Sequence, residues 1–218
     1  MTLLDLDSDQ LLSSTRAVRK RLDLSRPVPD EIIRECVSIA LQSPSGSNNP
    51  TMQFVIVRDA GKRKAIGDVY RQCYGIYKSM DGIYIGTIDK GSPEDNVVQQ
   101  RSASSADWLG EHMGEAPVLV LPCTTGRLDN QPAMISASIA GNIAPAAWSF
   151  MLAARARGLG GCWTTVHLMM EQAVADIVGI PFGEIQQFCL IPLGYTLGTE
   201  FKPARRPSPD SIIHWDRW

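Results

Sequence analysis

The sequence has few of the residues that build metal sites and disulfide frameworks. Of its 218 residues, five are cysteine and three are histidine. No two cysteines stand in a C-x-x-C spacing, and the histidines are scattered. This pattern excludes a dedicated zinc or iron–sulfur motif, so we expect no metal ligands. The odd number of cysteines and their mostly apolar neighbours predict buried free thiols.

Long hydrophobic runs and several catalytic motifs are also lacking. No run reaches the ~18–20 consecutive apolar residues of a membrane-spanning helix. The first seven residues lack the basic and then apolar layout of a signal peptide. We therefore expect a cytoplasmic protein with no membrane partner. G-x-S-x-G and the P-loop motif are both missing, which argues against a serine hydrolase of that type and against a P-loop nucleotide-binding protein.

The charge balance and the composition are those of an ordinary globular protein. Lys and Arg number 21 and Asp and Glu number 23, for a formal net charge of −2. Nucleic-acid binding needs a basic face or stripe, so this balance argues against a nucleic-acid partner. Apolar residues make up 44% of the chain, which is enough for a sizeable core. Because no repeat and no linker divides the chain, we predict a single domain over residues 1–218.

Periodicity and turn residues place the main elements. Helical spacing of apolar residues predicts four helices, and compact β-branched runs predict three strands. The helices cover residues 8–15, 29–43, 134–157 and 171–178, with Pro145 as a possible kink in the third. Ser8 and Asp9 are the expected caps of the first. The strands cover residues 53–57, 116–123 and 187–193, and Cys162 to Thr165 is strand-like.

Two segments fall outside this pattern. Residues 74–100 contain several glycines and three tyrosines, Tyr74, Tyr77 and Tyr84, without a sustained period. We expect an irregular excursion over the surface, of the kind that forms lids and binding loops. The tyrosines either line a pocket or pack the segment onto the body. The tail, residues 198–218, ends in Trp215 and Trp218, and because these are costly to leave in water we expect it to dock.

Three motifs allow both a structural and a functional interpretation. The basic segment from Arg16 to Arg21 is either a solvated face or an anion site in which Arg16 and Arg19 project together. The loop Ser45-Gly46-Ser47-Asn48 is either a plain turn or a set of donors around a flat polar ligand. The glycines of Gly158-Leu159-Gly160-Gly161 follow a helix, whereas those of a dinucleotide fingerprint open one, so a helix C-cap is favoured on local evidence.

The order of these motifs resembles that of the FMN-dependent nitroreductase family, from about Leu11 to Trp218. The resemblance is greatest to small actinobacterial members. It is carried by five blocks: Thr15-Arg16-Ala17-Val18-Arg19, Gln42-Ser43-Pro44-Ser45-Gly46-Ser47-Asn48, Ala153 to Trp163, Ile180-Pro181 with Leu190 to Tyr195, and Arg205-Arg206-Pro207 before a His-Trp ending.

This resemblance implies an α+β fold and an intertwined homodimer. A central, mainly antiparallel mixed sheet is flanked by helices, FMN lies at the dimer interface, and the C-terminal tail wraps the partner. NADPH or NADH is the transient hydride donor, and a nitroaromatic or quinone is the small-molecule electron acceptor in a ping-pong cycle. The protein then needs no catalytic acid or base of its own, because the cofactor carries the chemistry.

The resemblance also implies a set of FMN-binding residues. Arg16 and Arg19, with Ala17 and Val18 between them, meet the flavin phosphate and pyrimidine edge, and Arg205 binds the phosphate. The loop residues that touch the ring or ribityl chain are Pro44, Ser45, Gly46 and Asn48. Those near the ring edge are Gly160, Gly161, Thr164 and Thr165.

The chain departs from the family pattern at two places, and other functions stay open. Ala17 replaces the usual serine, which removes a hydroxyl donor, and Pro50-Thr51-Met52 replaces the usual Pro-Trp. The alternatives are another activity on the same fold, such as flavin or enone reduction, dehalogenation or flavin fragmentation, and a flavin-binding or storage protein without turnover. A nucleic-acid-associated role for Arg16 to Arg21 is a third.

Overall fold

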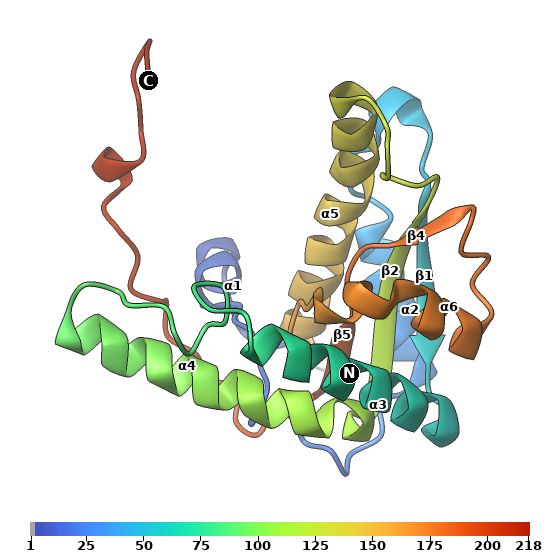
Figure 1. Cartoon of the computed structure of the whole chain (residues 1–218), viewed down its shortest axis with the longest axis horizontal. Coiled ribbons are helices and arrows are strands. Elements are labelled where there is room, and N and C mark those ends of the chain that lie inside the picture. The colour runs from blue at the N-terminus through green and yellow to red at the C-terminus, as the bar shows by residue number, and fades with distance from the viewer. Residues whose placement is uncertain (1–2) are drawn as a thin grey trace.

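The computed structural model describes residues 3–218, with Ser47 described by its backbone alone. Its centre is a sheet in the order β1-β2-β5-β3, with β4 also paired to β2, and every strand pair is antiparallel (Figure 1). The strands are β1 (Met52–Val57), β2 (Val118–Thr125), β3 (Leu159–Gly161), β4 (Ile185–Gln187) and β5 (Ile191–Tyr195). Strand β1 pairs only with β2 and therefore forms one edge of the sheet.

Helices cover both faces of this sheet. They are α1 (Ser8–Ser14), α2 (Asp30–Ala40), α3 (Ala60–Lys78), α4 (Pro93–His112), α5 (Ala133–Ala156) and α6 (Glu171–Val178). Alternate residues of β2 point to opposite faces, as in any strand. Val118 and Val120 pack with α2 and α5, whereas Leu119 and Leu121 pack with α3 and α6. The result is the predicted α+β architecture, with one core on each side of the sheet.

The long helix α5 confirms the prediction of a central helix. It continues through Pro145 without a break. It begins and ends one residue before the predicted bounds of 134 and 157. Its C-terminal half is buried, for example at Phe150, which no solvent reaches. In the part of the chain that the structure describes, α5 is also the one helix long and apolar enough to cross a membrane by length and composition, a test that core helices of soluble proteins pass as well.

The first two helices and the burial of the cysteines agree with the predictions from the sequence, except for the residue that caps the first helix. Helix α1 is capped by Asp7, whose side chain accepts from the Gln10 amide, and not by Ser8 or Asp9. Helix α2 begins after Pro29 and ends at Ala40, before the predicted end near residue 43. All five cysteines are free and buried, as predicted.

The predicted excursion over residues 74–100 is wrong over about half of its length, at both ends. Helix α3 continues to Lys78 and α4 begins at Pro93, so only the stretch from 79 to 92 lies outside these helices. Gly75 sits within α3, where helix interiors tolerate glycine at a cost of about 1 kcal/mol. Pro93 starts a helix because Ser92 caps it and the first helical position needs no backbone donor.

The predicted strand over residues 187–193 is two strands. Strand β4 ends at Gln187, the Phe188 amide still donates to the carbonyl of Pro122 in β2, and Leu190 bonds to Thr164 before β5 begins at Ile191. The prediction of a strand-like segment from Cys162 to Thr165 is wrong, because the strand lies on the glycines before it. Strand β3 ends at Gly161, and Thr164 forms only an isolated bridge to Leu190.

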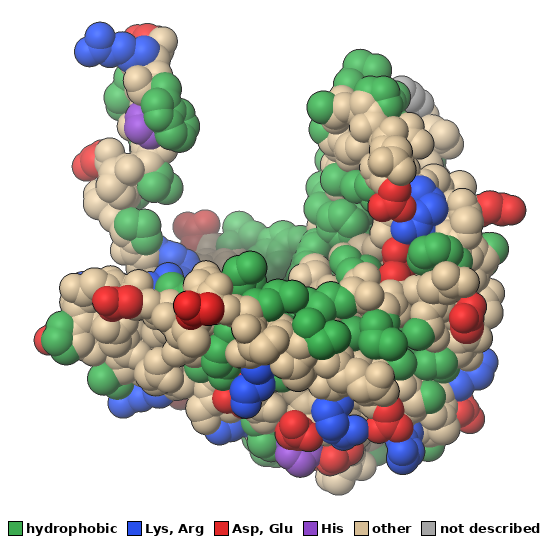
Figure 2. All heavy atoms as spheres, viewed as in Figure 1, with side chains coloured by type: hydrophobic (Ala, Val, Ile, Leu, Met, Phe, Trp, Pro, Cys, Tyr) green, Lys and Arg blue, Asp and Glu red, His purple; other side chains and the backbone are tan. Residues whose placement is uncertain are grey.

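The end of the C-terminal tail lies away from the body of its own chain, whereas the base of the tail contacts the body through Arg21 and Arg205. Figures 1 and 2 show the end of the tail leaving the body, with open space between it and α5, and residues 205–218 are all exposed. Trp215 is 81% exposed and Trp218 is 100% exposed. These rings do not pack against the body of their own chain, and the expectation that the tail docks on a partner subunit stays a prediction.

Candidate functional site

The first basic segment and the glycine segment lie side by side, as the predicted site requires. The amide of Val18 donates to the carbonyl of Gly161 at 2.8 Å, and Ala17 forms a parallel bridge with Gly161. A Cβ at Gly160 would lie 2.6 Å from Thr196 Cγ2 and 2.8 Å from Val18 Cγ2. Glycine is required there by this close approach, so the packing of the chain itself explains Gly160.

The C-cap interpretation of the glycine cluster holds for its first residue. Gly158 follows the end of α5 with φ of +75°, in the left-handed region that glycine adopts without strain. A Cβ at Gly161 would lie 2.8 Å from Ile191 Cγ2 and 2.9 Å from the carbonyl oxygen of Pro192. The glycines thus serve the turn and the sheet, whether or not a ligand passes nearby.

Two arginines of the basic segment fasten the base of the tail. Arg16 is exposed and donates through Nη1 to the carbonyl of Lys202 at 3.0 Å. Arg21 donates to the carbonyls of Leu197, Gly198 and Glu200 at 2.9, 2.8 and 3.2 Å. The segment is therefore more than a solvated face, because it fixes where the tail leaves the body.

The side chain of Arg19 has different neighbours from that of Arg16. It is half-buried, close to the thiol of Cys162. Burial raises the pKa of that thiol, and the positive charge and hydrogen bond of Arg19 act in the opposite direction. Arg19 also lies near the Tyr70 hydroxyl, whose pKa is raised mainly by burial. These neighbours hold a cationic group at the edge of β3.

The tail arginine Arg205 lies against the first turn of α4. Its guanidinium forms an ion pair with Asp95 at 3.1 Å and stays 77% exposed. A pair this exposed contributes little to stability and exchanges readily with another anion. Arg205 is thus available for a phosphate, although the structure gives no contact between it and Arg16.

The serine-rich loop lies on another part of the molecule. The Gly46 amide donates to Asn142 Oδ1 at 2.6 Å, which holds the turn Gly46–Asn48 on α5. Pro44 and Asn48 are exposed and Ser45 is half-buried, and Asn48 has φ of +50°. Asn142 and Ala156, the last residue of α5 before the glycine segment, are 14 positions apart, which is about 21 Å of helix.

The predicted FMN-binding residues therefore form two separate groups in one chain. One group contains the basic segment, Gly160 and Gly161, and the other contains Pro44, Ser45, Gly46 and Asn48. In Figure 1 the loop lies beside the upper end of α5, whereas the glycine segment follows its lower end.

The two threonines differ in what they offer. Thr164 is buried, and its hydroxyl donates to the carbonyl of Leu190 at 2.7 Å, so this hydroxyl is occupied within the protein. That Thr164 lies near the ring edge stays a prediction, in which its hydroxyl is not a free donor. Thr165 is exposed and lines a hollow of about 310 Å³ with Trp163 and Phe188.

Tyr77 and Tyr84 tie the 79–92 stretch to the helices, and Tyr74 ties α3 to α4. The hydroxyls of Tyr74 and Tyr84 donate to Asp107 at 3.1 and 2.8 Å, and the hydroxyl of Tyr77 accepts from the Ile85 amide at 2.8 Å. Burial is the main cause that raises the pKa of Tyr84 to about 12. These contacts favour the packing interpretation over that of a pocket wall.

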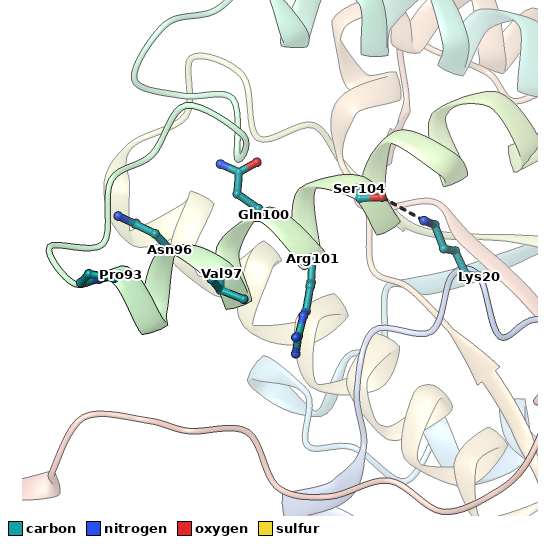
Figure 3. A pocket seen from close by; sticks show the side chains of 7 residues that line it. All are labelled: Lys20, Pro93, Asn96, Val97, Gln100, Arg101 and Ser104. Atoms are coloured by element: carbon teal, nitrogen blue, oxygen red, sulfur yellow. Dashed lines mark hydrogen bonds between the residues drawn. The ribbon is translucent and has the colours of Figure 1, made fainter.

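Sequence reasoning missed a basic groove along α4 (Figure 3). It has a volume of about 670 Å³ and is lined by Lys20, Pro93, Asn96, Val97, Gln100, Arg101 and Ser104. Lys20 donates to the Ser104 hydroxyl at 2.9 Å, while the exposed Arg101 reaches along the opposite side of the groove. Two cations without a lining carboxylate suit an anionic group. The spacing of residues 97, 101 and 104 on one helix face was the available signal.

Metal binding finds no support in the described part of the chain. Within residues 3–218 no three side chains of His, Cys, Asp or Glu lie close enough together to hold a metal ion. His167 is completely buried, and burial lowers its pKa to about 3, so its ring is neutral.

The chain is similar to known proteins over most of its length. A family model described as the nitroreductase family matches residues 12–195. A protein of Methanothermobacter thermautotrophicus named "Putative NADH dehydrogenase/NAD(P)H nitroreductase" is 23% identical, over 98% of this chain and 88% of that protein. The iodotyrosine deiodinase 1 of Rattus norvegicus is 28% identical over 51% of this chain and 35% of its own length.

Solved structures share the fold at low sequence identity. A crystal structure of iodotyrosine deiodinase bound to FMN and 3-iodo-L-tyrosine superposes with a TM-score of 0.71 at 20% identity, over 95% of this chain and 98% of that one. The FMN and NADPH-dependent nitroreductase NfnB of a Sphigopyxis strain gives a TM-score of 0.66 at 18% identity, over 98% and 100% of the two chains.

Proposed function

This chain belongs to the nitroreductase family of flavoprotein oxidoreductases, and we propose that it is an FMN-dependent NAD(P)H oxidoreductase that reduces nitroaromatic or quinone-type acceptors with ping-pong kinetics. The observation that carries the proposal is the pairing of the Arg16 to Arg19 segment with Gly160 and Gly161, next to the tail base. That pairing joins two blocks separated by more than 140 residues.

The residues present fit FMN by their chemistry. Arg16 and Arg205 are exposed guanidinium groups, which bind phosphate through charge-assisted hydrogen bonds. Ala17 offers no hydroxyl, so the phosphate relies on these arginines. When bound, FMN supplies hydride transfer between a nicotinamide and the acceptor.

The chain's own contribution is binding and electrostatics. Arg19, fixed beside Cys162, would lie at the pyrimidine edge of the ring, where negative charge gathers on reduction. A fixed cation there favours the reduced state. No side chain of the protein has to move a proton in this scheme, which fits the lack of a catalytic dyad in the sequence.

A second copy of the chain would complete the site. The loop from Pro44 to Asn48 and the basic segment lie at different ends of α5 within one chain, so we propose that each flavin is held by the basic segment of one subunit and the loop of the other. This homodimer is the one expected from the sequence.

Three exposed surfaces support the proposed dimer. The first is the edge strand β1, and the second is a groove of about 680 Å³ between β1 and α2, lined by apolar Ile33, Val37 and Phe54. The third is the tail with its exposed tryptophans. The groove also has charged Asp30, Arg34 and Arg58 in its lining. An unpaired strand edge and the apolar part of the groove need cover, and the partner's tail, which carries both apolar and charged side chains, is a matching occupant.

The test of the proposed function is an absorbance spectrum of the purified protein before and after anaerobic NADPH or NADH. We expect oxidised-flavin bands that bleach on addition and return with a quinone or nitroaromatic. A yellow protein that never bleaches would instead indicate storage. A colourless protein that takes up no added FMN would refute the proposal.

Arg19→Ala sharpens this test. Loss of the cation at the pyrimidine edge should lower flavin occupancy or slow reduction by NAD(P)H, measured by stopped-flow absorbance. Lys62→Ala removes an exposed cation on α3 and serves as the control. Equal flavin content and equal reduction rates in the two variants would contradict the role of Arg19.

Dehalogenation is a second candidate, favoured by the likeness to iodotyrosine deiodinase in both sequence and structure. Release of iodide from 3-iodo-L-tyrosine by the reduced protein would support it. Turnover of a quinone without iodide release would favour the first proposal.

A further inference from the structure

Arg155, in the last turn of α5, is a buried cation without a counter-ion. Arg155 is only 3% exposed. Its Nε and Nη1 atoms have no hydrogen-bond partner within residues 3–218. No ion pair to a carboxylate is formed there by the described residues. A buried guanidinium that lacks acceptors is costly, because the hydration it loses is not replaced.

The nearest neighbours of Arg155 add to this imbalance. Its guanidinium carbon lies 4.8 Å from the centre of the Phe201 ring, and that of Arg21 lies 4.1 Å from the same ring. Burial first, and then the like charge of Arg21, lower the pKa of Arg155 from its usual value. Two guanidinium groups thus share one aromatic ring, and an anion beside Arg155 would relieve their repulsion.

Arg155 lines a hollow of about 480 Å³ between the base of the tail and the N-terminal segment with α1. Gln10, Ser13 and Ser14 contribute polar groups, and Leu4, Leu6, Phe201 and Pro203 contribute apolar ones. The volume exceeds what a single inorganic ion needs. The lining therefore suits a molecule with one anionic group and an apolar body.

The charges around this hollow limit where the anion can sit. Asp5 and Glu200 also line it, but both are exposed and neither pairs with Arg155. Lys202 contributes a further cation. Neither Arg16 nor Arg205 lines the hollow, but Arg16 donates to the carbonyl of Lys202, so the hollow adjoins the residues proposed to bind the flavin phosphate.

We propose that this hollow binds a small organic oxyanion, whose phosphate or carboxylate group pairs with the guanidinium of Arg155 and whose apolar body lies against Leu6 and Phe201. Its walls come from both the body and the tail base. Bound ligand therefore ties the tail to the body at the point where the tail departs.

Thermal unfolding of the full-length, FMN-saturated protein tests this site. Bound FMN already fills the site proposed for its own phosphate, so an added anion reports on binding elsewhere. Inorganic phosphate is titrated at constant ionic strength. Above its dissociation constant, each tenfold increase should raise the unfolding midpoint by about 3–5 °C. Phenyl phosphate and benzoate then distinguish a phosphate ligand from a carboxylate, and both should act at lower concentration than inorganic phosphate.

Arg155→Met should remove this rise, whereas Lys62→Met, which deletes an exposed cation on α3, should keep it. Because the methionine fills a similar space without a buried charge, the variant is expected to fold. Arg155→Lys keeps the charge but loses the planar donors, and should keep only part of the rise.

Two results would overturn the proposal. One is an equal rise in the wild type and in Arg155→Met, which would place anion binding elsewhere. The other is no response to any of the three anions together with a lower midpoint for Glu200→Gln or Asp5→Asn, which would show that a carboxylate of the chain itself neutralises Arg155.

Discussion

The two halves of helix α5 are both apolar in sequence, yet the chain buries only one of them. From Ile143 onward, most of the helix packs on the sheet and on α2, and Phe150 and Ala146 are inaccessible to solvent. Before that point Met134 is 76% exposed and Ile135 is 37% exposed. Apolar residues therefore form part of the core in the C-terminal half of α5, whereas in the N-terminal half they form an exposed surface.

The tail also exposes large apolar side chains that lack cover in a single chain. Ile212 is 66% exposed and the two terminal tryptophans are bare. A monomeric protein rarely leaves large apolar residues in contiguous patches. The exposed half of α5, the groove beside β1 and the tail together favour the homodimer that we propose.

The largest expected effect is on the buried half of α5. Phe150→Ala removes a ring that packs on Phe54 at 5.6 Å between centroids, and it should cost about 3–5 kcal/mol in the free energy of unfolding. Met134→Ala, in the exposed half, should change the monomer by less than about 0.5 kcal/mol. Urea unfolding at low protein concentration measures both. Equal losses would break the contrast between the halves.

Truncation after Pro207 tests the cover proposed for the exposed surfaces. Loss of residues 208–218 should weaken the dimer, because the tail's apolar side chains no longer reach the partner, while the sheet and both cores remain. Sedimentation velocity over a dilution series measures the change. The double variant Trp215→Ser and Trp218→Ser is the milder counterpart. A truncated protein that stays fully dimeric at low concentration would refute the wrapping tail.

Gly160→Ala probes the close packing beneath the end of α5. The new Cβ would lie less than 3 Å from Val18 and Thr196, and such overpacking costs about 1–3 kcal/mol. Gly75→Ala is a matched control, since a Cβ there meets nothing within 4 Å and helix propensity favours alanine. Destabilisation by Gly160→Ala and slight stabilisation by Gly75→Ala are expected in chemical denaturation. The reverse order would contradict the packing argument.

The last prediction concerns the pH dependence of stability and His167, which is completely buried. The unfolded chain takes up a proton near pH 6.5, whereas burial holds the folded pKa at about 3. Between these values the unfolded state binds more protons, so stability falls as pH falls, by up to about 1.4 kcal/mol per pH unit. His167→Leu should lose that part of the pH dependence. Parallel stability profiles from pH 7 to 4 for both proteins would show that His167 does not contribute.

Local signals predicted the elements that have strong local causes. The helix at residues 171–178 matches α6 residue for residue, and the central helix is displaced by one residue. The misreading of residues 74–100 also has a local cause, because Ser92 and Pro93 form a helix start that the count of glycines obscured. The sequence contained that signal.

The candidate site was harder to predict because it depends on distant contacts. The partner of the Thr164 hydroxyl, Leu190, lies 26 residues away. Likewise, nothing in the motif order reveals that the loop around Gly46 is fixed to Asn142, far along α5 from the glycine segment. Motif order predicted which blocks form the candidate site, and the tertiary contacts decide which of them meet within one chain.

The five buried cysteines make the protein suited to selective chemical labelling. Burial raises the pKa of Cys36 to about 11 and that of Cys123 to about 12, so these thiols stay protonated and react slowly with alkylating reagents. A single cysteine introduced in the exposed tail, for example by Ser211→Cys, would then be the fast-reacting position. A spin label or fluorophore attached there would report where the tail lies, in solution and without removal of any native thiol.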